Sequence, residues 1–359
     1  MKKLLLSLII TLAATTIWAK QEKFTREINK DFSVSADAFL QITNKYGNVN
    51  IIEGNEGKIV FKIEITGKGD TDEIAKQYAE QVNIDFSASN NRVTATTRIP
   101  NMNCSNCGIS VHYVVSVPRS TTMDFDLKYG NLNMNDTPKP LTVLIKYGNI
   151  NAKTIADAAI DIKYGNVDFT KCKDLKLNAG YGNFKSNEIS KATIDIKYGN
   201  VTFATCKDLK LNAGYGNLTA DEIGNVAIDI KYGKVDIGSI KNLAINSKYT
   251  NFNIKNLENS FIASEITYGK VIIDNISTDF SKITATGKYT DFSLGLNNKH
   301  NFKAELSAYY GNINCQKISF NANVTGESKL RQLTGVAGAS SNPKAEVKIS
   351  TTYANITFK

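Results

Sequence analysis

The chain has few of the residues on which catalytic and metal sites depend. Among its 359 residues there are two histidines, His112 and His300, and neither completes a catalytic triad with its neighbours. A structural zinc site needs two pairs of ligands. The sequence offers a single close pair of cysteines, Cys104 and Cys107. These absences argue against a hydrolase triad and against a structural zinc site.

Long apolar runs are confined to the start of the chain. Lys2 and Lys3 precede an apolar run over residues 4–18, which stops at Ala19. This pattern predicts a secretory signal peptide over residues 1–19. An uncleaved anchor is the alternative, because the third-from-last residue is a bulky isoleucine. No later stretch approaches the ~20 apolar residues of a membrane-spanning helix, and no cysteine follows the expected cut, so we expect no membrane span after cleavage and no lipid anchor there.

The net charge of +9 has no focus in the sequence. Basic residues are interspersed with acids, which does not fit a nucleic-acid-binding protein with a basic patch. We therefore expect no nucleic-acid partner and no cofactor. An exported chain of this charge suits a glycan, an anionic envelope polymer or another envelope protein as partner. Its expected location is the periplasm, the outer-membrane surface or the extracellular space.

One motif, Tyr-Gly-Asn, is abundant. The sequence Ile-Asp-Ile-Lys-Tyr-Gly-Asn-Val occurs identically at 160–167 and 194–201. Its tyrosine recurs every 17 or 18 residues at Tyr129, Tyr147, Tyr164, Tyr181, Tyr198, Tyr215, Tyr232 and Tyr249. Looser copies follow at Tyr268, Tyr289, Tyr310 and Tyr353, and an early copy stands at Tyr46. A fixed period of this size predicts a stack of one structural unit.

We number each repeat from its tyrosine as position 1. Positions 4 and 14 are apolar in the repeats, as at Val167 and Leu177, and alternation around them predicts two short strands with polar corners. Such a unit cannot bury its apolar side alone. The sequence therefore predicts an all-β fold, a single-chain parallel β-solenoid (β-helix) with rungs of ~17 residues, and we expect right-handed coiling.

Position 15 distinguishes a rung of 17 residues from one of 34. Aspartate and asparagine alternate there at Asp161, Asn178, Asp195, Asn212, Asp229 and Asn246. A rung of 34 residues would stack aspartate on aspartate at about 5 Å, whereas a rung of 17 separates them by about 10 Å. We interpret the longer period as charge interleaving on a 17-residue rung.

The repeats divide the mature chain into three stretches of one continuous domain. Residues 20–128 are predicted to hold strands, a helix at about 70–82 and a Cys-x-x-Cys loop. Residues 129–319 form the regular solenoid, and residues 320–359 a loop and closing strands. The closing strands are expected to form the last rung, whose edge would be open unless a loop covers it.

The five cysteines fall into two groups. Cys104 and Cys107 lie in a polar loop, where a local disulfide is expected in an oxidising compartment, with unpaired thiols or a metal site as alternatives. Cys172, Cys206 and Cys315 occupy apolar positions of the repeat. Two rungs, about 10 Å, separate Cys172 from Cys206, beyond the ~7 Å reach of a disulfide. We expect all three to be buried free thiols.

The motif itself is interpreted as the structural corner of each coil. Counting by twos from position 14 places the tyrosines inward, although outward rings would form an aromatic ladder able to stack on sugars. Gly165 and Gly199 are expected to serve a tight corner rather than a positive φ, because Thr250 stands at the same position. Asn166 and Asn200 are expected to form a hydrogen-bonded ladder between rungs.

Together these features resemble the bacterial "putative adhesin" family of exported β-solenoid proteins. The resemblance rests on the early Lys-Tyr-Gly-Asn-Val copy at 45–49, a helix-bearing insertion, a strand ending in Val117-Pro118, the repeats and a closing Thr-Thr-Tyr-Ala-Asn-Ile at 351–356. It covers about residues 36–359. It implies an envelope β-solenoid of unknown function and assigns no functional residues.

The leading hypothesis is a non-enzymatic exported solenoid whose repetitive surface serves adhesion or envelope interaction. A second hypothesis is a carbohydrate-active enzyme on acidic polysaccharide, with Asp161, Asp195 and Asp229 in line on one face. A catalytic pair should be singular and set in a cleft, and these aspartates repeat along an open face. A self-assembling fibre subunit and an envelope-signalling subunit are the third and fourth hypotheses.

Overall fold

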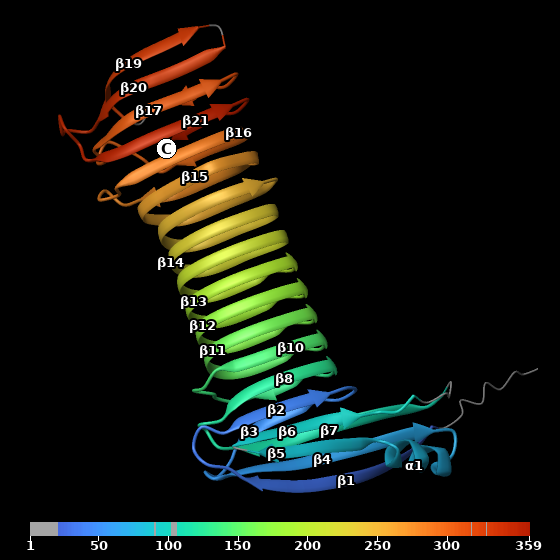
Figure 1. Ribbon diagram of the computed structural model, residues 1–359. Coiled ribbons are helices and arrows are strands. Elements are labelled where there is room, and N and C mark those ends of the chain that lie inside the picture. Colours follow the sequence, from blue (N-terminus) through green and yellow to red (C-terminus); the bar gives the residue numbers. More distant parts are fainter. Residues whose placement is uncertain (1–20, 90, 102–105, 317, 328) are drawn as a thin grey trace, which may run out of the picture.

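The computed structural model describes residues 21–89, 91–101, 106–316, 318–327 and 329–359. The predicted signal peptide and Cys104 lie outside the described residues. The described chain forms a rod of stacked coils with a broader layer of strands at its N-terminal end (Figure 1). This architecture confirms the predicted parallel β-solenoid.

The strands and the helix follow one another in three regions. The N-terminal region comprises β1 (Glu22–Ser33), β2 (Phe39–Asn44), β3 (Val49–Glu53), β4 (Lys58–Gly69), α1 (Asp72–Glu80), β5 (Asn83–Ser89), β6 (Arg92–Arg98) and β7 (Gly108–Val117). The solenoid comprises β8 (Thr122–Tyr129), β9 (Leu132–Met134), β10 (Leu141–Tyr147), β11 (Ile150–Tyr164), β12 (Val167–Tyr181), β13 (Phe184–Tyr198), β14 (Val201–Lys248), β15 (Thr250–Ile276) and β16 (Lys282–Leu294). The C-terminal region comprises β17 (Phe302–Tyr309), β18 (Ile313–Asn314), β19 (Phe320–Glu327), β20 (Leu330–Ala337), β21 (Ala345–Thr352) and β22 (Ile356–Phe358).

The rungs are 17 residues long in the centre of the rod. Strand β12 pairs in parallel with β11 and with β13, and Asn178 lies between Asp161 and Asp195. Asn178 Nδ2 donates to Asp161 Oδ2 at 3.0 Å. The interleaving of amides and carboxylates therefore has the predicted register.

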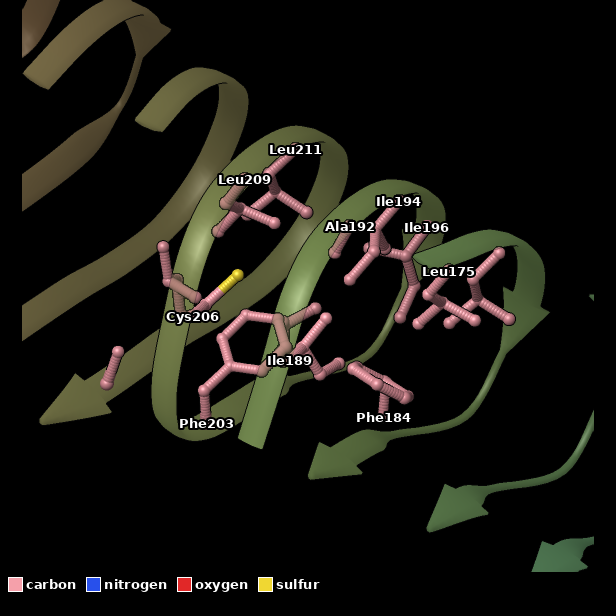
Figure 2. Packing of buried hydrophobic residues seen from close by; sticks show 14 of the residues in the cluster. Leu175, Phe184, Ile189, Ala192, Ile194, Ile196, Phe203, Cys206, Leu209 and Leu211 are labelled. Carbon is pink, nitrogen blue, oxygen red and sulfur yellow. The ribbon is translucent and has the colours of Figure 1, made fainter. Parts of the chain in front are cut away.

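Apolar side chains of each rung meet inside the coil (Figure 2). Phe169, Phe184 and Phe203 pack edge to face along the axis, with centroids 6.1 and 5.6 Å apart. The phenylalanine stands at position 6, then at position 4, then at position 6 again, so that large and small side chains interlock between neighbouring rungs. The 34-residue period therefore has a second cause inside the core.

The N-terminal end of the stack is closed by antiparallel strands. Strands β2 and β3 form the first rung, with β8 and β9 on one side and β6 and β7 on the other. Antiparallel β4 and β1 continue the sheet from β7, and β5 continues it from β6. The predicted helix is present as α1, whose cap Thr71 accepts from the Ile74 amide and which buries Ala75 and Ala79.

The C-terminal end departs from the expected order. Strand β21 lies between β16 and β17 and pairs in parallel with both, while β22 lies between β16 and β18. Antiparallel β20 and β19 cover the far side of β17. The expectation that residues 345–358 form the last rung is wrong, because the chain leaves one rung vacant after β16 and returns to fill it (Figure 1).

Candidate binding surface: the tyrosine edge

The tyrosines of the repeat form one exposed stack along the rod, which we call the tyrosine edge. Its members, in spatial order, are Tyr46, Tyr129, Tyr147, Tyr164, Tyr181, Tyr198, Tyr215, Tyr232, Tyr249, Tyr268, Tyr289, Tyr353 and Tyr310. Neighbouring ring centroids are 4.7–5.1 Å apart and the planes differ by 2–8°. At a rung spacing of ~4.8 Å, the edge is roughly 60 Å long.

The rings face outward, so the expectation from counting by twos is wrong. Their exposed fractions run from 36% at Tyr164 to 49% at Tyr249. The alternation of inward and outward residues breaks at the corner, where Lys163 and Tyr164 are both exposed between buried Ile162 and Val167. A strand period of two holds within a strand and is not carried through a turn.

Stacking determines which part of each ring a ligand can reach. An internal ring such as Tyr198 has Tyr181 on one face, at 4.7 Å, and Tyr215 on the other, at 5.0 Å. Its planar faces are therefore occupied by its neighbours, and the exposed part is the ring edge and the hydroxyl. The tyrosine edge can offer hydrogen bonds and edge contacts once per rung, whereas it offers no free faces for sugar stacking along its length.

The corner glycines combine close packing with positive φ. Gly165 has φ 147°, and a Cβ there would lie 1.7 Å from the Gly148 carbonyl oxygen. The tight corner is present, but the expectation that positive φ plays no part is wrong. Where Thr250 stands at this position, the preceding Tyr249 takes the positive φ instead, at 51°. The corner therefore has two backbone solutions, and a β-branched residue occurs only in the second.

The asparagines at position 3 link successive rungs. Asn166 Oδ1 accepts from the backbone amide of Asn183 at 2.9 Å and from Asn183 Nδ2 at 3.2 Å. Asn200 Oδ1 accepts in the same way from Asn217, at 3.0 Å for both donors. The side chain thus satisfies a backbone donor at the corner of the following rung and holds the corners in register.

Lysines flank the tyrosines at position 17. They are Lys45, Lys128, Lys146, Lys163, Lys197, Lys231, Lys248 and Lys288. Lys163 Nζ lies 5.6 Å from the Tyr164 ring centroid and Lys128 Nζ lies 5.6 Å from that of Tyr129, within the range of a cation–π contact. Within the part of the chain that the structure describes, no carboxylate lies within 4.0 Å of these eight ammonium groups. Their charges are therefore available to an anionic partner.

The aspartates of the enzyme hypothesis lie on an open strand face. Asp195 Oδ2 accepts from Asn212 Nδ2 at 2.9 Å and Asp229 Oδ2 from Asn246 Nδ2 at 3.1 Å, as Asp161 does from Asn178. The carboxylates are exposed and do not line the cavities described below. Their hydrogen bonds make them part of the inter-rung ladder.

The histidines and thiols have structural surroundings. His112 Nδ1 accepts from the Asn48 amide at 3.1 Å, and buried His300 has Nε2 3.0 Å from the Ile276 carbonyl oxygen. Cys172 and Cys206 are buried free thiols, whereas Cys315 is free and half-buried. Burial raises the pKa of all three thiols to about 12. Cys104 is outside the described residues, so its bond to Cys107 stays a prediction.

The cavities of the rod are shallow. One of about 400 Å³ and one of about 380 Å³ share Lys191 and Thr193 and follow the strand surface on a face away from the tyrosines. Among the described residues, no group of three or more histidines, cysteines or acids could hold a metal ion. In the same residues, no helix is long and apolar enough to span a membrane.

Sequence reasoning missed two features of the tyrosine edge. It treated Tyr353 as the last copy, although this ring stacks between Tyr289 and Tyr310 at 4.9 Å from each. It also gave the lysines before the tyrosines no role. Their regular place at position 17 was visible in the repeats and was the signal that could have revealed the charged border.

Comparison with known proteins places the whole repeat region in one family. A family model described as Toastrack DUF4097 matches residues 39–359, which confirms the predicted family resemblance. No curated protein matches the chain.

Solved structures similar to this chain include three described as adhesion proteins. A putative adhesin from Bacteroides fragilis NCTC 9343 is 15% identical, with 64% of this chain and 96% of that chain covered and a TM-score of 0.27. A putative adhesin from Parabacteroides distasonis ATCC 8503 is 14% identical, with 74% and 96% covered and a TM-score of 0.33. A putative cell adhesion protein from Clostridium sporogenes ATCC 15579 is 10% identical, with 94% and 100% covered and a TM-score of 0.22. At these low TM-scores, the likenesses add nothing to the fold described above.

Proposed function

We propose, on the premise that the chain belongs to the Toastrack DUF4097 family, that it is an exported, non-enzymatic β-solenoid of the cell envelope that binds a linear polymer along the tyrosine edge. The partner is a glycan or another anionic envelope polymer, and the biological role is adhesion or envelope interaction. The observation that carries the proposal is the continuity of the edge, in which thirteen exposed tyrosines stand in one stack bordered by unpaired lysines.

The repetition of the edge suits a polymer better than a small molecule. Each rung offers one phenol hydroxyl and one ring edge, and an exposed contact of this kind contributes little by itself. A polymer that lies along the rod makes the same contact at many rungs, and every contact after the first forms at high effective concentration. Affinity should therefore rise steeply with polymer length up to about 60 Å, the length of the edge.

The edge is also held rigidly enough for repeated binding. The asparagine ladder fixes each corner to the next, as between Asn166 and Asn183. The stacked rings restrain one another, so little conformational entropy is lost when a ligand binds. The aspartates on which the enzyme hypothesis relies are engaged in the strand-face ladder, which favours the binding function over that hypothesis.

The proposal is tested by removing hydroxyls while the ring stack is kept. The triple variant Tyr181→Phe, Tyr198→Phe, Tyr215→Phe keeps all ring contacts, and binding to an array of bacterial and plant polysaccharides is compared with that of the mature wild type. At about 0.5–1.5 kcal/mol per hydrogen bond, we expect a loss of affinity of roughly tenfold or more for the bound polymer.

A matched control removes three hydroxyls from other exposed strand positions. Thr142→Val, Thr170→Val and Thr193→Val together leave the tyrosine edge intact. This control should bind as the wild type does. Equal binding by the tyrosine variant and the wild type would show that the ligand is bound elsewhere.

A further inference from the structure

The border of the tyrosine edge alternates between charged and bare rungs. Position 17 is Lys163, Gly180, Lys197, Gly214 and Lys231 in five successive rungs. Two rungs separate one lysine from the next, which is about 10 Å at the usual strand spacing. The ammonium groups therefore form a row with half the frequency of the tyrosines.

The bare rungs are imposed by the backbone. A Cβ at Gly180 would lie 2.6 Å from the carbonyl oxygen of Lys163, and one at Gly214 would lie 2.7 Å from that of Lys197. These distances are too short for a side chain without movement of the neighbouring rung. The gap between two lysines is thus a built feature of the stack.

Tyrosine exposure follows the same alternation. Tyr181 and Tyr215, which follow the glycines, are 45% and 46% exposed. Tyr164, Tyr198 and Tyr232, which follow the lysines, are 36%, 42% and 41% exposed. Each glycine rung is therefore a notch with a more accessible tyrosine, and a lysine stands on either side of it.

The negative charges of the same rungs point elsewhere. Asp161 and Asp195 accept hydrogen bonds from the asparagines of the following rungs on the strand face, and no carboxylate of the described residues lies within 4.0 Å of Lys163, Lys197 or Lys231. Opposite charges are thus separated sideways, with carboxylates on the strand face and ammonium groups at the tyrosine edge. A chain bound at the edge meets the ammonium groups first.

From this spacing we infer that the polymer bound at the tyrosine edge is an acidic polysaccharide with one carboxylate per disaccharide. A sugar unit in an extended chain advances by about one rung, so two units match the step from one lysine to the next. The acidic sugar lies beside a lysine, and the neutral sugar lies in the glycine notch against the exposed tyrosine. The inference rests on the proposed function and specifies its ligand class.

Three polymers of matched length distinguish the charge spacing. Hyaluronan carries one carboxylate per disaccharide, polymannuronate one per sugar, and a cello-oligosaccharide none. Binding of the mature protein is measured by biolayer interferometry at physiological salt. Hyaluronan should bind most tightly per carboxylate, and the neutral chain most weakly.

Two triple variants locate the charges. Lys163→Gln, Lys197→Gln, Lys231→Gln should reduce hyaluronan affinity by roughly tenfold or more and remove its advantage over the neutral chain. Lys176→Gln, Lys191→Gln, Lys210→Gln makes the same change in net charge on another face and should bind as the wild type does. Far-UV circular dichroism and urea midpoints verify that both variants are folded.

The outcomes separate the two proposals. Absence of binding to every polymer would overturn both the proposed function and the ligand class. Binding in which polymannuronate is preferred per carboxylate, or in which the two lysine variants lose affinity equally, would refute the two-rung spacing and leave polymer binding in place. Preference for hyaluronan that is lost only in the first variant supports the inference.

Discussion

Replacement of Asn166 by alanine removes one link of the asparagine ladder, and its cost follows from three hydrogen bonds. Asn166 Nδ2 donates to Asn149 Oδ1 at 3.2 Å, and Asn166 Oδ1 accepts from the amide and the side chain of Asn183 at 2.9 and 3.2 Å. The variant leaves the Asn183 backbone amide without this acceptor. At about 0.5–1 kcal/mol for each bond, the free energy of unfolding should fall by roughly 1.5–3 kcal/mol.

Asn166→Asp is the matched variant, because the chain already contains this arrangement elsewhere. Asp291 occupies position 3 of its rung and accepts from the amide and the side chain of Asn355 at 2.8 and 3.3 Å. An aspartate at residue 166 keeps both acceptor bonds and loses only the donated one. It should recover more than half of the stability that alanine loses.

The measurement is urea unfolding of the mature chain, followed by far-UV circular dichroism at neutral pH. The unfolding slopes of the three proteins should agree, so that the midpoints report stability. An Asn166→Ala change below about 0.5 kcal/mol, the usual range for surface substitutions, would refute the structural role assigned to the ladder. Equal losses in the alanine and aspartate variants would refute the importance of the acceptor.

Three further predictions concern the ladder, the corner and the thiols. Lys234 interrupts the asparagine ladder, so Lys234→Asn should restore an acceptor for the following rung and raise the urea midpoint despite loss of the 2.9 Å ion pair with Asp236; an unchanged or lower midpoint would contradict this. Gly165→Ala should lower the free energy of unfolding by at least about 2 kcal/mol, because it combines positive φ with a clash against the Gly148 carbonyl, and differential scanning calorimetry would show a wild-type transition if this is wrong. Cys172, with its thiol pKa raised to about 12 by burial, should resist iodoacetamide at pH 8 in the folded protein and react once the chain is unfolded in urea, as peptide mass spectrometry would record. Since the folded pKa lies above the unfolded value of about 8.5, the contribution of this thiol to stability is complete below that pH and declines as the pH rises towards 12.

The repeat made the fold predictable from the sequence. A fixed 17-residue step left one way to bury the apolar positions, and the alternation of Asp161 and Asn178 identified the rung length. The core contributed a second reason for the 34-residue period, because Phe184 at position 4 interlocks with Phe169 and Phe203 at position 6. That reason was hidden in the sequence, since it depends on which side chains meet across rungs.

The corner was harder to predict because turns interrupt the period of two. Tyr164 and Lys163 are both exposed, which no count through the turn could show. Thr250 was misleading for a related reason: the positive φ had moved to Tyr249, so the glycine position no longer required it. The order of the last rungs was also beyond local patterns, because the pairing of β21 with β16 and β17 joins residues far apart in the sequence.

The returning segment separates the order of synthesis from the order of stacking. Strands β17 and β20 precede residues 345–358 along the chain, yet β21 stands between β17 and the body of the rod. Until that segment arrives, β16 and β17 face each other across an unfilled slot with two unpaired edges, which are surfaces open to pairing with another chain. Export that delivers residues 345–358 late would therefore leave the growing protein exposed to misassembly at this point, and their insertion closes both edges in one step.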